Sequence, residues 1–139
     1  MTENSFRVLI VDDAEIMRKL VHKACTEMGF TDIVEAEDGE AAWSVLESSK
    51  PPISLILCDW NMPKLTGLDF LKRTRAHELY KSVYFILITV ESDKEQVVAA
   101  LQHGVDNYVM KPCTLDILKA KIKSTLTRPK SPSPTTPAV

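Results

Sequence analysis

The sequence predicts an α/β fold in which a doubly wound, five-stranded parallel sheet is covered on both faces by helices, giving a three-layer sandwich. Two observations predict it. Short apolar runs alternate five times with longer segments whose apolar residues recur at helical spacing. One run, Leu55 to Cys58, is wholly apolar without a helical period, as expected of a strand buried on both faces. Strands that alternate with helices in this way form parallel sheets with right-handed crossovers.

The five expected strands differ in polarity and strength. The first is rich in β-branched residues, the second carries two acidic residues, and the third is wholly apolar. The fourth has the strongest strand pattern, Val-Tyr-Phe-Ile-Leu-Ile-Thr, and the fifth is short. Because the second is the most polar, we expect it nearer an edge of the sheet. The strands cover residues 6–11, 32–36, 55–58, 83–89 and 107–110.

The helices are supported by amphipathic spacing and by residues that begin or end them. Gly29 and Gly104 follow the first and fourth helices, where a left-handed conformation costs glycine little. Asp38 opens the second helix, and Thr114 is expected to cap the last. The helices cover about residues 14–28, 40–48, 68–76, 94–103 and 114–126.

Length and composition favour one domain over residues 1–127. The net charge of −2 gives no case for a nucleic-acid partner, and no run is apolar enough for a membrane span or a secretory signal. Three cysteines, Cys25, Cys58 and Cys113, lie far apart, which favours buried free thiols in a reducing cytoplasm. Residues 128–139 are rich in proline, serine and threonine, so we expect a disordered tail.

Polar side chains stand at the carboxyl ends of four of the five strands. Asp12 and Asp13 follow the first strand, and Asp59 ends the third. Thr89 ends the fourth and Lys111 follows the fifth. Taken singly, each has an ordinary structural explanation: an aspartate that caps a helix or anchors a loop, a threonine bonded to backbone, a solvated lysine. In a parallel sheet, however, all these ends meet at one edge.

Taken together, these side chains indicate phosphoryl-transfer chemistry. Three adjacent carboxylates repel one another unless a cation compensates, and Mg²⁺ prefers such oxygen ligands. A lysine can hold a phosphate oxygen, and a threonine hydroxyl can donate to another. The sequence has neither a P-loop nor a Gly-x-Gly-x-x-Gly motif to hold a nucleotide. The phosphoryl group must therefore arrive on another donor, and a carboxylate is the natural acceptor.

This pattern of residues resembles the receiver domain of two-component response regulators. The resemblance covers about residues 5 to 127 and rests on the aspartate pair, Asp59, Thr89 and Lys111-Pro112. Four stretches are similar to those of single-domain chemotaxis regulators, namely Val-Asp-Asp, Glu-Ala-Glu-Asp-Gly, Cys-Asp-Trp-Asn-Met-Pro and Tyr-Val-Met-Lys-Pro. The resemblance implies a flavodoxin-like fold with strand order 2-1-3-4-5.

The resemblance also implies a role for each residue at this edge. Asp59 would accept a phosphoryl group from the phosphohistidine of a sensor histidine kinase. Asp12, Asp13, Asp59 and the backbone carbonyl of Asn61 would hold Mg²⁺, and Lys111 would pair with the phosphoryl group. The protein would thus be a signalling phosphoacceptor and not an enzyme.

A second group of residues would relay or tune the signal. In the family, Thr89 moves toward the phosphoryl group and Tyr108 turns inward, which changes the surface of the fourth helix, fifth strand and fifth helix. On its own, Tyr108 is more typical of a half-buried strand aromatic, and only the surrounding match favours the switch role. Asn61 and Glu91 would flank the path of the hydrolytic water and so tune how long the acyl phosphate survives.

Two positions depart from the family pattern. Val90 stands where a small residue is usual, and its branched side chain could narrow access to the phosphoryl group. Cys113 stands where an aromatic residue is common, so we expect different packing there. Neither departure removes a residue of the expected site.

The resemblance leaves the pathway open. A chemotaxis regulator would bind the flagellar motor switch and could be served by a phosphatase; we expect a cytoplasmic monomer. The alternatives are a stand-alone receiver in a phosphorelay or another pathway, or a receiver from a longer protein. An aspartyl-phosphate phosphatase usually needs a second aspartate where Asn61 stands. A flavin-binding protein would need long ring- and phosphate-binding loops, which the sequence lacks.

Overall fold

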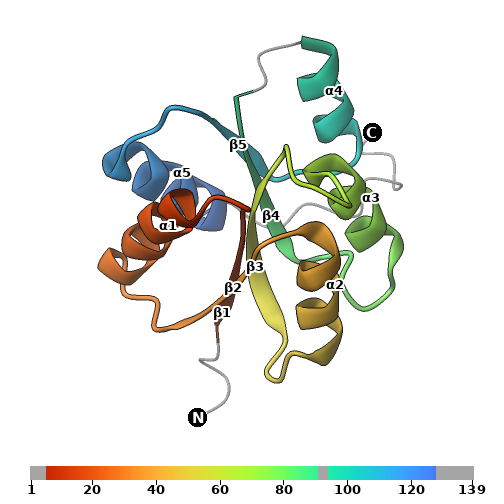
Figure 1. Ribbon diagram of the computed structural model, residues 1–139, viewed down its shortest axis with the longest axis horizontal. Helices are drawn as coiled ribbons and strands as arrows, with labels where there is room; N and C mark the ends of the chain where they lie inside the picture. The colour runs from red at the N-terminus through yellow and green to blue at the C-terminus, as the bar shows by residue number, and fades with distance from the viewer. Residues whose placement is uncertain (1–5, 91–93, 128–139) are drawn as a thin grey trace.

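The computed structural model describes residues 6–90 and 94–127. Strands and helices alternate throughout these described residues (Figure 1). The elements are β1 (Arg7–Val11), α1 (Glu15–Glu27), β2 (Asp32–Ala36), α2 (Gly39–Ser48), β3 (Ile53–Asp59), α3 (Gly67–Ala76), β4 (Tyr84–Thr89), α4 (Lys94–Gln102), β5 (Asn107–Met110) and α5 (Leu115–Thr127).

The strands form one parallel sheet in the order β2-β1-β3-β4-β5, so the predicted fold class and strand order are confirmed. β2 lies at an edge, as its polarity predicted. β3 lies at the centre with six of its seven residues buried, and it extends beyond the predicted run at both ends, from Ile53 to Asp59. The sheet therefore carries Asp59 directly from its core to its carboxyl edge.

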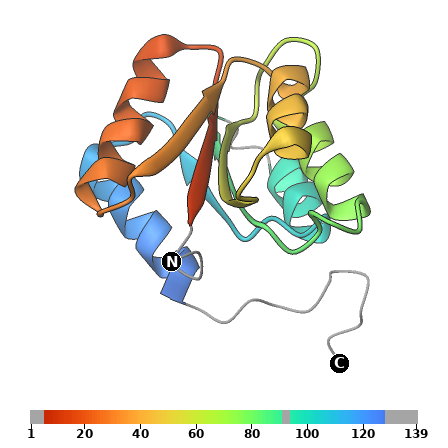
Figure 2. The ribbon, with the colours of Figure 1, turned by 90° about the horizontal axis from the view of Figure 1, so that it is seen from below.

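Helices cover both faces of the sheet and enclose two hydrophobic cores. Figures 1 and 2 show α1 and α5 on one face and α2, α3 and α4 on the other. The core beneath α1 and α5 includes Val8, Ile10, Val21, Leu55, Leu57, Ile86, Leu118 and Ile122. The opposite core includes Leu9, Leu46, Ile56, Phe70, Leu71, Phe85 and Leu87. Successive residues of β3 thus alternate between the two cores, which holds the central strand in register.

The predicted ends of the helices are correct to within one or two residues. Gly29 and Gly104 have φ of +98° and +89°, the left-handed conformation that ends α1 and α4. The Asp38 carboxylate accepts a hydrogen bond from the Ala41 N–H at 2.8 Å and caps α2. The Thr114 hydroxyl accepts one from the Ile117 N–H at 3.2 Å at the start of α5.

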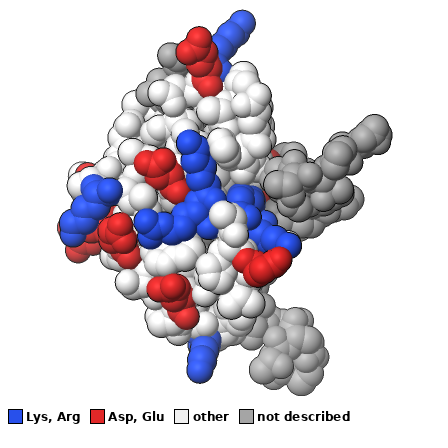
Figure 3. Space-filling view, turned by 90° about the vertical axis from the view of Figure 1, so that its right-hand side faces the viewer, with Lys and Arg blue, Asp and Glu red and all other residues white. Residues whose placement is uncertain are grey.

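Charged side chains are unevenly spread over the face formed by α2, α3 and α4. Figure 3 shows lysine and arginine side chains gathered near the middle of this face, with aspartate and glutamate around them. Part of this charge is paired, because Arg73 of α3 lies 3.7 Å from Glu40 of α2. Lys64, in the loop before α3, lies 3.6 Å from Asp38. These pairs join α2 to α3 across the surface.

The helices, the cysteines and the end of the chain bear on three further predictions. Within the described part of the chain, no helix is long and apolar enough to cross a membrane. Cys25 and Cys58 are free and buried, and burial raises the pKa of the Cys25 thiol to about 12. Cys113 is also free but only half-buried, unlike the expectation. The predicted tail, residues 128–139, lies outside the described residues.

Candidate functional site

Three carboxylates meet at the carboxyl edge of the sheet. Asp12 and Asp13 follow the last residue of β1, and Asp59 is the last residue of the neighbouring β3. Each offers one oxygen, and these oxygens all lie within 4.8 Å of one another. Asp12 and Asp59 are 2% and 4% exposed, whereas Asp13 is open to solvent. The arrangement is a set of hard oxygen ligands with one accessible side, which suits a divalent cation such as Mg²⁺.

Asp12 is fixed on several sides by hydrogen bonds. Its N–H donates to the Ala36 carbonyl of β2 at 3.1 Å, and its carboxylate accepts from the Ala14 N–H at 2.9 Å. Its carbonyl accepts from the Arg18 guanidinium at 2.7 Å. The N-cap residue of α1 is Ala14, which makes no side-chain cap, so the capping interpretation of Asp12 and Asp13 is wrong.

Asp59 is not a helix cap either. The next helix, α3, is capped by Thr66, whose hydroxyl accepts from the Asp69 N–H at 3.1 Å. The chain between them folds back on the strand, because the Gly67 N–H donates to the Trp60 carbonyl at 2.8 Å. A Cβ atom on Gly67 would lie 2.4 Å from the Asp59 carbonyl oxygen. Glycine is therefore required for α3 to begin directly against the end of β3.

Lys111 joins the two buried carboxylates. Its ammonium lies 3.1 Å from Asp59 Oδ1 and 3.5 Å from Asp12 Oδ2, and its side chain is 18% exposed. Its N–H donates to the Thr89 carbonyl at 2.7 Å, which ties the end of β5 to the end of β4. Three of the residues predicted at this edge, Asp12, Asp59 and Thr89, are thus brought together around this lysine.

Before any cation binds, the ionised form of Asp59 is electrostatically unfavourable in this cluster. Burial and the Asp12 charge raise the pKa of Asp59; hydrogen bonds from Lys111 and the Asn61 backbone and the Lys111 charge offset them only in part. Burial lowers the pKa of Lys111, but its bond to Asp59 and both carboxylate charges outweigh burial and raise that pKa above its usual value. Added positive charge at this edge would therefore stabilise the ionised carboxylates.

Of the other predicted residues, Thr89, Val90 and Asn61 lie at or just after the ends of their strands. Thr89 ends β4 and is 1% exposed, while the adjacent Val90 is 58% exposed. The Asn61 side chain is exposed in the loop after β3. Glu91 lies outside the described residues.

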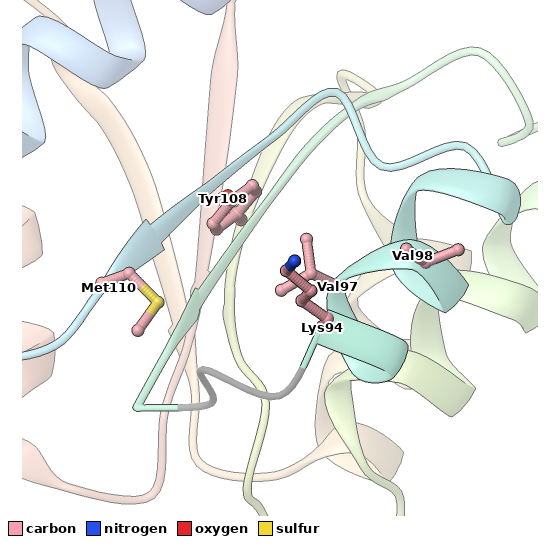
Figure 4. A pocket seen from close by; sticks show the side chains of 5 residues that line it. All are labelled: Lys94, Val97, Val98, Tyr108 and Met110. Atoms are coloured by element: carbon pink, nitrogen blue, oxygen red, sulfur yellow. The ribbon is translucent and has the colours of Figure 1, made fainter.

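Tyr108 is half-buried and lines a separate pocket of about 380 Å³ between β5 and α4. Figure 4 shows Tyr108 and Met110 on one wall, with Lys94, Val97 and Val98 on the other. The ammonium of Lys121 on α5 lies 5.6 Å from the centre of the Tyr108 ring. This side chain therefore faces α4 across the pocket and lies close to Lys121 of α5.

Two residues of the site were missed by sequence reasoning. Arg18 belongs to the polar side of α1 by its spacing, and the fold turns it onto the Asp12 carbonyl. Gly67 is one residue of a loop in the sequence, but in the structure it lies against the backbone of Asp59. A glycine shortly after a strand-terminal aspartate was the available signal for Gly67; no local signal marks Arg18.

Comparisons with known proteins agree with this geometry. Residues 8–123 match the response regulator receiver domain. A chemotaxis protein CheY homolog of Campylobacter jejuni is 38% identical over 120 residues, covering 86% of this chain and 92% of that protein. Chemotaxis protein CheY of Pseudomonas aeruginosa is 38% identical over 122 residues, covering 88% and 97%. The structure of chemotaxis response regulator CheY4 of Vibrio cholerae superposes with a TM-score of 0.79 at 25% identity, covering 88% and 99%.

The family match covers most of the chain, and the acidic cluster lies at the expected edge of the expected sheet. A receiver acts as a signalling phosphoacceptor and not as an enzyme. The chain belongs to the response regulator receiver domain family.

Proposed function

We propose that Asp59 accepts a phosphoryl group from the phosphohistidine of a sensor histidine kinase and that the modified protein then binds a target. One observation carries this proposal. The buried Asp59 carboxylate lies beside the Asp12 carboxylate and is paired with the Lys111 ammonium, with Nζ 3.1 Å from Oδ1. This environment disfavours the free carboxylate and supplies a cation for added phosphoryl oxygens.

In the transfer, the phosphorus–nitrogen bond of the donor breaks as a bond forms to a carboxylate oxygen of Asp59. Asp12, Asp13, Asp59 and the Asn61 carbonyl would hold Mg²⁺, and the three carboxylates provide oxygen ligands of the right kind. Bound there, Mg²⁺ supplies neutralisation of the charge on the phosphoryl oxygens. Lys111 exchanges its present bond to Asp59 for one to the phosphoryl group.

Two further residues carry the change to the surface. Thr89 moves toward the phosphoryl group and donates a hydrogen bond from its hydroxyl to a phosphoryl oxygen. Tyr108 then turns into the space that Thr89 leaves. Support comes from their placement, since Thr89 ends the strand beside β5 and Tyr108 faces α4 and lies close to Lys121 of α5. Phosphorylation thereby shifts a pre-existing equilibrium between two arrangements of the α4-β5-α5 surface.

Incubation with acetyl phosphate and Mg²⁺, followed by intact-mass measurement, tests the phosphoacceptor. We expect one phosphoryl group on the wild type and none on Asp59→Asn. An equal mass gain on the variant, or none on the wild type, would overturn the assignment. Omitting Mg²⁺ should abolish the gain.

The target we propose is the flagellar motor switch, with the protein acting in the cytoplasm as a monomer. Relatives at 38% identity over most of both chains are named chemotaxis proteins, which supports this pathway. A pull-down with a motor-switch peptide should capture the protein only when beryllofluoride mimics the phosphoryl group. Failure with beryllofluoride, alongside normal phosphorylation, would favour a phosphorelay or another pathway.

Val90 should influence how quickly the phosphoryl group is gained or lost. Its side chain is 58% exposed directly beside Thr89 and can narrow the approach to Asp59. We expect Val90→Ala to change the rate of phosphorylation by acetyl phosphate or of dephosphorylation severalfold. Leu79→Ala, at an exposed aliphatic residue between α3 and β4, is the control and should leave both rates unchanged. Identical kinetics for Val90→Ala and the wild type would remove this role.

A further inference from the structure

Arg18 clamps the end of β1 to the edge of the sheet. Its Nη1 donates to the Asp12 carbonyl at 2.7 Å, and its Nε donates to Glu35 Oε1 at 3.1 Å. The Arg18 side chain is 16% exposed and that of Glu35 is 37% exposed. One guanidinium on α1 therefore holds the residue that follows β1 and also holds the neighbouring β2.

We infer that Arg18 is a positioning residue for the cation site, an inference that rests on the function proposed above. Asp12 is the proposed ligand that lies between these contacts. Its N–H is held by Ala36, its two carboxylate oxygens by Ala14 and Lys111, and its carbonyl by Arg18. The Arg18 contact opposes rotation of the peptide that follows Asp12, and this peptide also sets the direction of Asp13.

The clamp and the charge of Arg18 have opposite effects on a bound cation. A guanidinium close to the cluster repels Mg²⁺, so on charge alone its removal would tighten binding. Loss of the clamp would let Asp12 and Asp13 leave the orientation that brings their oxygens within 4.8 Å of that of Asp59, and would weaken binding. The sign of the change therefore separates the two roles.

The chain offers a matched control at the other end of the same strand pair. Arg7 Nε lies 3.0 Å from Asp32 Oδ1, and the two side chains are 22% and 39% exposed. Arg7 and Asp32 are register partners that join β1 to β2 at the amino end of the strands. Arg18 joins Asp12, which follows β1, to Glu35 of β2 at the carboxyl edge. Loss of the Arg7 pair should destabilise the sheet about as much as loss of the Arg18 pair. It should not disturb the carboxylates of the cation site.

The test is calorimetric titration of Mg²⁺ into the wild type, Arg18→Gln, Arg18→Lys and Arg7→Gln, with thermal unfolding of each in metal-free buffer. We expect Mg²⁺ affinity to fall by about tenfold in Arg18→Gln, the lower end of the range for residues that orient metal ligands. The Mg²⁺ affinity of Arg18→Lys should fall similarly, because one ammonium cannot make the two hydrogen bonds of the guanidinium fork. Arg7→Gln should keep wild-type affinity.

Each other outcome has a definite meaning. Unchanged or tighter Mg²⁺ binding in Arg18→Gln overturns the inference, as does full recovery in Arg18→Lys or an equal loss in Arg7→Gln. If Arg18→Gln does not fold, Glu35→Ala replaces it, since it removes the acceptor of one arm of the clamp and leaves the guanidinium in place. Weaker Mg²⁺ binding in Glu35→Ala supports the inference, and unchanged or tighter binding overturns it. Failure of the wild type to bind Mg²⁺ would count against the proposed function instead.

Discussion

At the scale of single residues, the site weakens the fold that builds it. The pKa of Asp59 is raised by burial and by Asp12, and Lys111 offsets this only in part. When the pKa of a carboxyl group is higher in the folded than in the unfolded chain, the folded state loses stability as the pH rises from the unfolded pKa through the folded pKa. At neutral pH without a cation, the ionised Asp59 is therefore a net cost to stability.

Asp59→Asn should accordingly raise the midpoint of thermal unfolding in metal-free buffer at neutral pH. Mg²⁺ should raise the midpoint of the wild type and leave that of the variant nearly unchanged, because binding stabilises only a chain with the site. Circular dichroism with chelator and with excess Mg²⁺ measures both effects. Asp116→Asn, an exposed carboxylate on α5, should behave as the wild type. A variant less stable than the wild type without metal would contradict this account.

At the scale of elements, α2 depends on an ionised cap. The hydrogen bond from the Ala41 N–H lowers the pKa of Asp38, and the nearby Lys64 charge adds to it. A lowered pKa gives stability that is complete above the unfolded pKa, about 4, and is lost as pH falls through the folded value. The start of α2 should therefore loosen in acid before the apolar core does.

Asp38→Ala should lower the free energy of unfolding by about 1 kcal/mol at neutral pH, as for other N-caps. The difference from the wild type should shrink once the pH falls below about 4. Urea unfolding at the two pH values measures it. Thr66→Ala removes the uncharged cap of α3, so its effect should not depend on pH in this range. A pH-independent effect of Asp38→Ala would show that the charge is irrelevant.

The start of α3 allows no side chain at Gly67. An added Cβ would lie 2.4 Å from the Asp59 carbonyl oxygen and 2.9 Å from Trp60 Cα, and backbone atoms cannot turn aside. We expect Gly67→Ala to cost about 1–3 kcal/mol, the usual range for overpacking, and to slow phosphorylation by shifting Asp59. Urea unfolding and the acetyl phosphate assay measure the two effects.

Gly29→Ala separates backbone strain from site damage. Gly29 has φ of +98°, and a Cβ atom added there would meet no other atom within 4 Å. Alanine there should cost roughly 1–2 kcal/mol through its left-handed conformation and leave phosphorylation unchanged. Normal phosphorylation in Gly67→Ala would show that the end of β3 tolerates the shift.

At the scale of the whole molecule, Arg75 joins parts that are distant in the chain. From α3, its Nε donates to the Gly104 carbonyl at 2.9 Å and its Nη1 to the Val83 carbonyl at 2.7 Å. Its Nη2 pairs with Asp106 at 3.0 Å, and the two side chains are 7% and 16% exposed. Asp106 also accepts from the Phe85 N–H at 2.8 Å. One arginine thus fixes α3 against the starts of both β4 and β5.

Arg75→Met should lower the free energy of unfolding by about 3–5 kcal/mol, because it leaves the Asp106 charge buried without its partner. Arg75→Lys should recover little of this, since lysine lacks the planar fork. The double variant Arg75→Met/Asp106→Asn should be more stable than Arg75→Met alone. Chemical denaturation checks the order of the three, and Lys119→Met at the exposed Glu27 pair should be nearly neutral. Equal stability of the single and double variants would refute the explanation.

The sequence was sufficient for the order of elements and for the edge where the site lies. Apolar runs such as Leu55 to Cys58 mark strands locally, and parallel strands bring their carboxyl ends together whatever the details of packing. Arg18 and Arg75 could not be found this way, because their partners include backbone carbonyls on other elements, brought near only by the finished fold. Asp59 considered alone favoured a cap, and the structure shows that Thr66 has that role.

The helices differ greatly in how firmly the sheet holds them. Among the nine residues of α4 only Ala100 is fully buried, whereas α5 buries Leu118, Ile122 and Thr125. Local opening free energies follow the apolar surface that an element buries, so we expect α4 to open at a lower free-energy cost than α5. The output surface proposed above therefore includes the helix that is easiest to displace. If a target binds this surface as proposed, it would displace a helix that buries little apolar surface, and the rest of the fold would stay intact.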